Sequence, residues 1–524
     1  MRKQCPCKKQ SPHRKNRIFA KIFIYIRVAK ELKSLVKDTA IYGLSSIVGK
    51  FLNWLLVPLY TFVLAQSSDY GIVTNLYSWT ALLVVILTYG METGFFRFAN
   101  RKEFAVNKIY TTTLTSIGST SLVFAITCVA FAQPIATLLG YPAHAEFIAM
   151  LGVVVSMDAF ASIPFAYLRY KGQALRFAIL KMTFVVLNIF LNIFFLILCP
   201  KIMSWKPELV AWFYNPDYGV GYVFVSNIIA TTIQTLCLLP QFLAEKYCFD
   251  AKVLKQLLSY SLPLLILGIA GIMNQTIDKI IFPFLIDNPE TANSELGIYG
   301  ACFKIAMVMM MFTQAFRYAY EPFVFAKHED KESVGAYADA MKFFVIFAWL
   351  IFLGITFYID IFKLIIRSDY WEGLKIVPII LCSYIFQGVF FNLSIWYKLT
   401  DKTKYGAYFS IIGLIITLII NIVFVPKYSY MASAMASLVC YFVIMIISYA
   451  IGQKYLKIPY DLRSIALYSI VAVGMYASSF VFQFESAVVN YIYKTVLLIL
   501  FVAIILKRDL PISQLPFIGK YFKK

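Results

Sequence analysis

The chain has 524 residues, of which 60% are hydrophobic and only 14% are charged. Soluble domains are about half apolar and one quarter charged, so this composition excludes an ordinary soluble enzyme, a disordered chain and a disulfide scaffold. The formal net charge of +21 is compatible with nucleic-acid binding, but in a membrane protein the same excess collects in cytoplasmic loops. We therefore expect an integral membrane protein with no nucleic-acid partner.

Long apolar runs predict an all-α protein with about 14 transmembrane helices, since about 20 apolar residues span a bilayer. In chain order the predicted spans are 39–65, 71–96, 110–132, 146–168, 177–199, 219–243, 257–285, 297–325, 340–361, 372–396, 405–425, 429–451, 463–484 and 487–506.

Lysine and arginine are distributed unequally between the loops. The loops that follow even-numbered spans are rich in both residues, whereas the loops that follow odd-numbered spans hold only Lys201, Lys206, Lys363, Arg367 and Lys427. By the positive-inside rule, this alternation predicts that the N- and C-termini both lie in the cytoplasm.

A weak internal repeat divides the chain. At a separation of 229 residues it relates Tyr141 to Tyr370, Arg169 to Lys398, and Asn192 to Asn421. Six helices per repeat give both halves the same orientation, which predicts two six-helix lobes related by a pseudo-twofold axis along the membrane normal. The expected segments are a basic cytoplasmic extension (1–38), an N-lobe (39–250), a C-lobe (251–453), two peripheral C-terminal helices (454–506) and a basic tail (507–524).

Charged residues inside apolar helices are costly and therefore mark candidate functional positions. They concentrate in the first two helices of each repeat, at Lys50, Glu92, Arg97, Asp278, Lys279, Lys304, Arg317 and Glu321. If these helices face one another, the cavity between them is cationic and favours anions such as the phosphates of a lipid headgroup. Asp158 is a further acid, alone among apolar neighbours in the fourth span.

Structural interpretations of these charges stay open. Glu92 and Arg97 lie near a helix end, where long side chains can reach water. Arg317 and Glu321 are spaced for an ion pair within one helix. Asp158 can be a neutral acid bonded to backbone.

Cofactor chemistry has no signature in the sequence. There is no P-loop, no dinucleotide-binding glycine pattern and no HExxH motif, and Cys5-Pro6-Cys7 lacks a second pair of metal ligands. We expect no cofactor and no metal.

Two sets of motifs point to a known family. Asp69-Tyr70-Gly71 and the run from Tyr89 to Phe98 (YGMETGFFRF) resemble the second helix of bacterial polysaccharide (O-antigen and capsule) flippases. Ile277-Asp278-Lys279, the run from Leu296 to Tyr299 (LGIY) and the run from Phe316 to Pro322 resemble the corresponding part of the second half. These flippases belong to the multidrug/oligosaccharidyl-lipid/polysaccharide exporter superfamily, and the resemblance extends over about residues 38–506.

The resemblance implies that the protein moves an undecaprenyl-diphosphate-linked oligosaccharide from the cytoplasmic to the outer leaflet of the bacterial inner membrane by alternating access. It also implies that Arg97 and Arg317 contact the headgroup, and that Na⁺ or H⁺ is coupled at Asp278. Lys50, Lys279 and Lys304 are substrate-binding candidates from the cavity argument alone, and Glu92, Glu321 and Asp158 are further ion-coupling candidates. Membrane lipids and the polysaccharide polymerase machinery are the expected partners.

Three other functions remain open. A flippase for lipid II, the peptidoglycan precursor, would suit fourteen helices equally well. A multidrug/cation antiporter would be expected to have twelve helices and an acidic, aromatic cavity. A polysaccharide polymerase or ligase would carry a large outer loop with catalytic residues, and the longest outer loop, about 200–218, contains no convincing set.

Overall fold

The structure is a computed structural model that describes residues 43–101, 103–326 and 333–509. The predicted extension 1–38 and all of the predicted tail after residue 509 lie outside the described residues. Within the described part, 13 helices are long and apolar enough to cross a membrane, and the shorter apolar helix Gly221–Cys237 stands where the sixth span is predicted. The expected all-α fold of about 14 spans is confirmed, and the chain is a multi-pass membrane protein.

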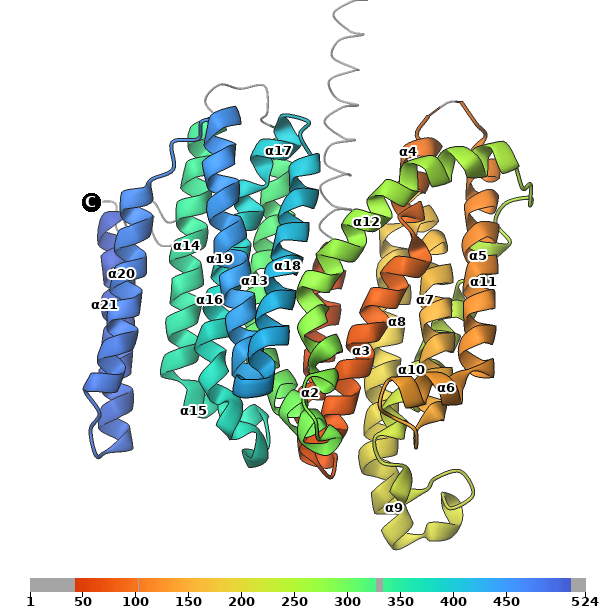
Figure 1. The fold of residues 1–524 in the computed structure, drawn as a ribbon, viewed down its shortest axis with the longest axis horizontal. Helices are drawn as coiled ribbons and strands as arrows, with labels where there is room; N and C mark the ends of the chain where they lie inside the picture. Colours follow the sequence, from red (N-terminus) through yellow and green to blue (C-terminus); the bar gives the residue numbers. More distant parts are fainter. Residues whose placement is uncertain (1–42, 102, 327–332, 510–524) are drawn as a thin grey trace, which may run out of the picture.

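The helices form two lobes and an outlying pair (Figure 1), and each lobe contains six of the spans. The N-lobe contains the first span Gly43–Val63, which ends in α2 (Leu56–Val63), then α3 (Ser67–Thr88), α4 (Met91–Ala99), α5 (Val106–Ala130), α6 (Ala132–Leu138), α7 (Ala145–Tyr170), α8 (Ala174–Ile193), α9 (Cys199–Trp205), α10 (Gly221–Cys237) and α11 (Leu239–Phe242). The C-lobe contains α12 (Ala251–Ile281), α13 (Pro289–Ala326), α14 (Ser333–Phe357), α15 (Ile359–Phe362), α16 (Val377–Leu393), α17 (Ile395–Leu399), α18 (Lys404–Tyr428) and α19 (Tyr430–Tyr455). The outlying pair is α20 (Leu462–Val481) and α21 (Ala487–Arg508), at the edge of the C-lobe.

The second span differs from its predicted form, because it is broken between α3 and α4. Tyr89 (φ 31°) and Gly90 (φ 70°) both adopt the left-handed conformation, which ends α3. A Cβ atom at Gly90 would lie 2.8 Å from the carbonyl oxygen of Ser261 in α12. The positive φ and this close approach together require glycine at the break.

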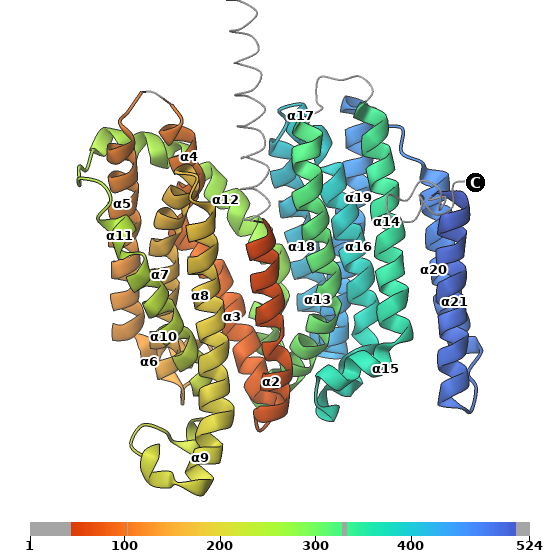
Figure 2. The same ribbon diagram turned by 180° about the vertical axis from the view of Figure 1, so that it is seen from behind.

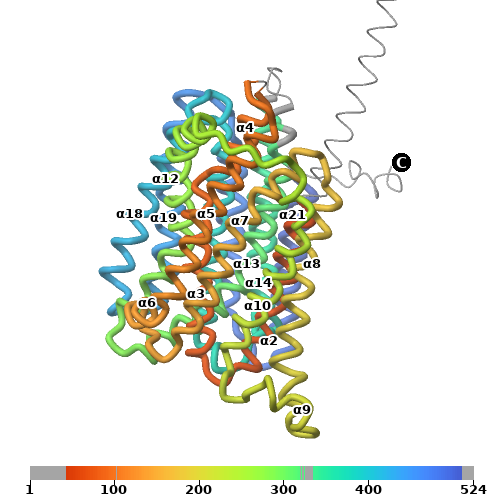
Figure 3. Tube along the Cα trace, turned by 90° about the vertical axis from the view of Figure 1, so that its right-hand side faces the viewer, coloured from red at the N-terminus to blue at the C-terminus, as the bar shows by residue number. Residues whose placement is uncertain are grey.

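The fifth span is longer than predicted. It runs from Ala174 to Trp205 because a π-helical segment, Phe194–Leu198, joins α8 to α9 without a break. Consequently α9 extends beyond the other helices at one end of the molecule (Figure 3). We call this the α9 end. The other end, where α4 and α17 lie, is the basic end and carries Arg101, Lys171 and Lys402.

The two lobes share one hydrophobic core toward the α9 end and have separate cores at the basic end. The shared core joins Tyr60 and Phe147 of the N-lobe to Phe282 and Tyr299 of the C-lobe. At the basic end, one core surrounds Phe95 and Tyr110 in the N-lobe, and another surrounds Trp396 and Phe409 in the C-lobe. The lobes are therefore packed together at the α9 end, and their ribbons diverge toward the basic end (Figure 1).

Two helices cross from one lobe to the other. The beginning of α12 packs in the N-lobe core through Val253 and Leu257, and its later part reaches the lobe interface. In the first span, Lys50 Nζ donates to Gln314 Oε1 of α13 at 2.7 Å, and Trp54 Nε1 donates to the carbonyl oxygen of Lys304 at 2.8 Å. This span lies between α8 and α13 when the molecule is viewed from behind (Figure 2). The first helix of each repeat thus contacts the opposite lobe.

Candidate substrate cavity

A cavity of about 480 Å³ lies between the lobes and is lined by residues of both. Its size is within the range of pockets that enclose a small-molecule ligand. The charged residues in its lining are Lys279 of α12 and Lys304 of α13. Both are predicted substrate-binding residues, and both belong to the C-lobe. The described lining contains no acidic side chain, so a free anion meets a positive potential there.

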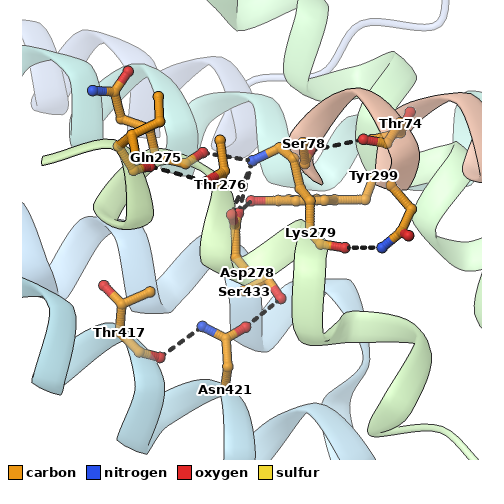
Figure 4. A network of polar contacts seen from close by, with 12 residues as sticks. Thr74, Ser78, Gln275, Thr276, Asp278, Lys279, Tyr299, Thr417, Asn421 and Ser433 are labelled. Atoms are coloured by element: carbon orange, nitrogen blue, oxygen red, sulfur yellow. Dashed lines mark hydrogen bonds and ion pairs between the residues drawn. The ribbon is translucent and has the colours of Figure 1, made fainter. Parts of the chain in front are cut away.

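Lys279 is paired with its sequence neighbour Asp278. Their side chains are 9% and 4% exposed, and Lys279 Nζ lies 2.9 Å from Asp278 Oδ2. Tyr299 donates a 2.6 Å hydrogen bond to the same carboxylate oxygen. The Lys279 ammonium also lies 4.0 Å from the centroid of the Phe303 ring. Figure 4 shows Lys279 and Tyr299 converging on Asp278, so this buried carboxylate is fully bonded.

The backbone around this pair is held from two other helices. Asn75 of α3 donates a 2.7 Å hydrogen bond to the carbonyl oxygen of Lys279. Below Asp278 in Figure 4, Ser433 of α19 donates to Asn421 of α18 at 2.6 Å, and Asn421 donates to the carbonyl oxygen of Thr417. Asn274 of α12 also donates a 2.7 Å hydrogen bond to the carbonyl oxygen of Ser410 in α18, so α12 is bonded to one helix of each lobe.

Lys304 presents the unneutralised cation of the cavity. Its carbonyl oxygen accepts from Trp54, but its ammonium forms neither a hydrogen bond nor an ion pair with any described residue. The neighbouring charge that acts on it is the like charge of Lys279. An anion that bridges Lys279 and Lys304 would relieve this repulsion.

The remaining C-lobe candidates lie outside the cavity lining, at the basic end. Arg317 pairs with Glu321 at 3.2 Å, in the i,i+4 arrangement that the sequence allows. Glu321 also accepts a 2.7 Å hydrogen bond from Lys398, and Arg317 lies over the ring of Phe391 at 5.3 Å. Lys50 of the first span, an N-lobe candidate, is exposed, is bonded to Gln314 of α13 and is also absent from the cavity lining. Lys50, Arg317 and Glu321 are thus bonded to other residues outside the cavity lining.

The N-lobe candidates Glu92 and Arg97 also lie at the basic end. Glu92 forms an ion pair with Arg169 of α7. Arg97 stacks on Tyr260 of α12, with its guanidinium carbon 4.0 Å from the ring centroid. Arg97 therefore joins α4 to α12.

Asp158 lies within α7, and its interacting charge is Lys181 of α8. No ion pair within 4.0 Å and no hydrogen bond joins the Asp158 carboxylate to the described part of the chain. Lys181 lies inside α8, within the predicted fifth span, with its ammonium 4.1 Å from the centroid of the Phe165 ring. Of the four acidic candidates, Asp158 alone lacks a bonded cation among the described residues.

Residues 35–319, more than half of the chain, match the family model described as polysaccharide biosynthesis protein. The chain belongs to the polysaccharide biosynthesis protein family. The comparison with curated proteins gave no match.

Solved structures share the fold of this polysaccharide biosynthesis family member. The lipid II flippase MurJ in an inward closed conformation superposes with a TM-score of 0.69 at 15% identity, covering 89% of this chain and 98% of MurJ. An inward-facing multidrug resistance transporter of the MATE family and MOP superfamily gives a TM-score of 0.59 at 12% identity, over 78% of this chain and 95% of the transporter. A MOP superfamily transporter from Pyrococcus furiosus gives 0.54 at 13% identity, over 80% and 96%. At these identities the likeness concerns the fold, which is that of MOP superfamily transporters.

The N-lobe wall of the cavity is the part that sequence reasoning missed. It contains the uncharged polar residues Asn53, Tyr77, Asn188 and Asn227, of which Tyr77 accepts a 3.0 Å hydrogen bond from Asn227. Asn188 and Asn192 lie four residues apart in α8, and amides in membrane helices commonly form contacts between helices. This fits Asn192, which accepts from Tyr60 at 3.0 Å, whereas Asn188 lines the cavity. Uncharged amides and phenols are common within membrane helices, so their presence alone is a weak signal.

Proposed function

We propose that this protein is a flippase for a polyprenyl-diphosphate-linked oligosaccharide, a precursor of surface polysaccharide. The observation that carries the proposal is the cavity between the lobes, whose charged lining residues are Lys279 and Lys304. A diphosphate carries several negative charges and accepts charge-assisted hydrogen bonds, so two ammonium groups suit it. The polysaccharide biosynthesis family supports an oligosaccharide as the attached group.

The transport cycle that we propose is alternating access. The lobes are packed at the α9 end and separate at the basic end, so this arrangement accepts substrate from the basic end. We assign the basic end to the cytoplasm and the α9 end to the outer face of the bacterial inner membrane, following the distribution of lysine and arginine. This assignment puts both termini in the cytoplasm and allows delivery to a polymerase at the outer leaflet.

Lipid II is the second candidate substrate, because it is also a polyprenyl diphosphate with an attached glycan and the MurJ fold superposes over 89% of this chain. A hydrophobic cation is less compatible with the cavity, since its described lining contains two lysines and no acid.

For coupling to H⁺ or Na⁺, we assign Asp158 in preference to Asp278. Asp278 is neutralised by Lys279, and Glu92 and Glu321 are paired with Arg169 and Lys398. An acid without a bonded cation can gain and lose an external cation without breaking an ion pair.

The proposal is tested by complementing strains that lack a polysaccharide flippase or the lipid II flippase, with leaflet-specific labelling of each lipid-linked precursor. The intact protein should expose a lipid-linked oligosaccharide on the outer leaflet, and Lys304→Ala should not. Lys454→Ala is the matched control, because Lys454 is an exposed lysine at the basic end, outside the cavity lining. Exposure of lipid II alone would favour the second candidate, and dye efflux without movement of either precursor would refute both.

A further inference from the structure

The two walls of the cavity differ in charge. The C-lobe wall carries Lys279 and Lys304, whereas the N-lobe residues in the lining are uncharged. The substrate class proposed above has the same division, because a diphosphate is ionic and most sugars are neutral and rich in hydroxyl groups. A ligand with one anionic and one neutral polar part is oriented by such a cavity.

The N-lobe wall also retains unused hydrogen-bonding capacity. Asn53 of the first span is exposed to the cavity, and its amide forms no hydrogen bond with the described residues. Asn188 accepts a 3.3 Å hydrogen bond from Asn192, but its own amide nitrogen donates to no described group. The Tyr77 hydroxyl accepts from Asn227, and its proton remains available. Polar groups that lack a partner within the protein are available to hydrogen-bond with water or with a polar ligand.

The aromatic residues of this wall complement its polar groups. Tyr60, Tyr70 and Tyr77 belong to the N-lobe lining together with the amides. An aromatic ring with a polar edge suits a sugar, which has apolar C–H faces and hydroxyl edges. The C-lobe wall also contains polar residues, but several are already engaged, as in the 2.7 Å hydrogen bond from Gln387 to Tyr441.

We propose that the N-lobe wall is a glycan-recognition surface in which Asn53, Tyr77 and Asn188 determine specificity, while the C-lobe lysines hold the diphosphate. This inference rests on the proposed function. Substrate bound in this way contacts both lobes at once. Its glycan contacts the N-lobe wall, and the N-lobe must move relative to the C-lobe during alternating access. A precursor with an unsuitable glycan would still contact Lys279 and Lys304 but would leave the N-lobe amides unsatisfied, which lowers its affinity.

The test measures binding of three lipids to the purified full chain in detergent: undecaprenyl diphosphate, and the same lipid carrying N-acetylglucosamine or galactose. The intact protein should bind at least one glycolipid more tightly than the sugar-free lipid. Three substitutions should each lower the affinity for that glycolipid by about two- to tenfold, which corresponds to one lost hydrogen bond: Asn53→Leu, Asn188→Leu and Tyr77→Phe. The affinity for the sugar-free lipid should stay unchanged. Lys304→Ala should lower the affinity for all three lipids.

Asn100→Leu is the matched control, since Asn100 is exposed at the basic end and bonds to the carbonyl oxygen of Phe96. It should change none of the affinities. Two results would overturn this inference without affecting the proposed function. The first is equal affinity of the intact protein for all three lipids. The second is an equal loss of affinity for glycolipid and for sugar-free lipid in the N-lobe variants. Failure of the intact protein to bind any of the three lipids would instead overturn the proposed function. Thermal unfolding of each variant separates loss of recognition from loss of folding.

Discussion

Lys398 donates a 2.7 Å hydrogen bond to Glu321, and this bond joins the far end of α13 to α17 at the basic end. The ion pair between Glu92 and Arg169 joins α4 to the end of α7 in the same way. Both members of the first pair lie 229 residues after their counterparts in the second (321 − 92 and 398 − 169). The internal repeat detected in the sequence is thus expressed as the same bridge between the second and fourth spans of each lobe.

The first prediction concerns these paired bridges. Glu92→Gln and Glu321→Gln should each lower stability by about 0.2–1 kcal/mol, since both bridges are half exposed. The charge exchange Glu92→Arg with Arg169→Glu should recover part of the loss, because the attraction is restored with opposite sense. Thermal unfolding in detergent of the single and double variants gives the coupling between the two residues. Strictly additive losses would show that the bridge contributes nothing to the lobe.

The second prediction concerns the crossing of α3 and α13 at the α9 end. A Cβ atom at Gly71 would lie 1.8 Å from the carbonyl oxygen of Asn293, and one at Gly297 would lie 2.0 Å from that of Ser67. Both partners are backbone atoms, so Gly71→Ala should push the two helices apart and lower the free energy of unfolding by about 1–3 kcal/mol. Gly474→Ala is the control, because nothing lies within 4 Å of a Cβ atom there.

Cross-linking gives a direct measurement of this separation. The hydroxyl oxygens of Ser67 and Ser294 are 2.6 Å apart. Ser67→Cys with Ser294→Cys should therefore form a disulfide, and adding Gly71→Ala should lower its yield. The disulfide should also stop transport until it is reduced, since the α9 end must open to release substrate. An oxidised protein that transports normally would contradict alternating access at this end.

Much of the fold follows from the sequence because apolar runs of fixed length and alternating loop charge reflect the bilayer directly. The exceptions are local. The break at Tyr89 and Gly90 depends on the approach of α12, and the length of the fifth span depends on a π-helical segment at Phe194–Leu198. Neither feature changes the apolar pattern, so neither could be predicted from it.

The candidate site was predictable only in part. Charge inside an apolar helix selects Lys279 and Lys304, which line the cavity. The same criterion also selects Arg97 and Arg317, which lie at the basic end, because spacing along one helix defines a face but not the depth of that face within the assembled lobes. The neutral residue Asn188 carries no such signal, and its place in the cavity is recognised only from the assembled lobes.

The third prediction separates these two groups of cations. Lys304→Ala should abolish outer-leaflet exposure of the substrate, while Arg97→Ala should reduce it far less. Loss of the Arg97 stack on Tyr260 should cost about 0.5–1 kcal/mol, and Tyr260→Leu should have the same, non-additive effect. Leaflet-specific labelling and thermal unfolding test the two statements. Complete loss of transport in Arg97→Ala with unchanged stability would assign the headgroup contact to the basic end instead.

The fourth prediction concerns the Asp278–Lys279 pair. Asp278→Asn leaves a buried ammonium without its counter-ion, which should lower stability by about 3–5 kcal/mol. Asp278→Asn with Lys279→Gln removes both charges and should be clearly more stable than the single variant. Thermal unfolding in detergent shows which of the two variants is more stable. Equal losses in both variants would show that the carboxylate acts through its bond to Tyr299 rather than through the ion pair.

The fifth prediction concerns the attachment of α21 to the C-lobe and its dependence on pH. Burial by itself would raise the pKa of Asp509, but hydrogen bonds from Tyr468 of α20 and Lys342 of α14, together with the charges of Lys342 and Arg508, bring this pKa below its ordinary value. Lys342 Nζ lies 2.9 Å from Asp509 Oδ1. A carboxyl group whose pKa is lower in the folded state stabilises the protein above its unfolded pKa of about 3.9, and this contribution disappears as the pH falls through the folded value.

Asp509→Asn should therefore lower the unfolding temperature in detergent at neutral pH, and the difference from the intact protein should shrink as the pH falls below about 4. The difference should arise in the outlying pair, because Asp509 is bonded to both α14 and α20. Asp217→Asn, in the loop before α10, is the control and should show no such pH-dependent difference. If the difference in unfolding temperature between Asp509→Asn and the intact protein stays constant down to pH 2, the stabilisation comes from packing around Asp509 and not from its charge.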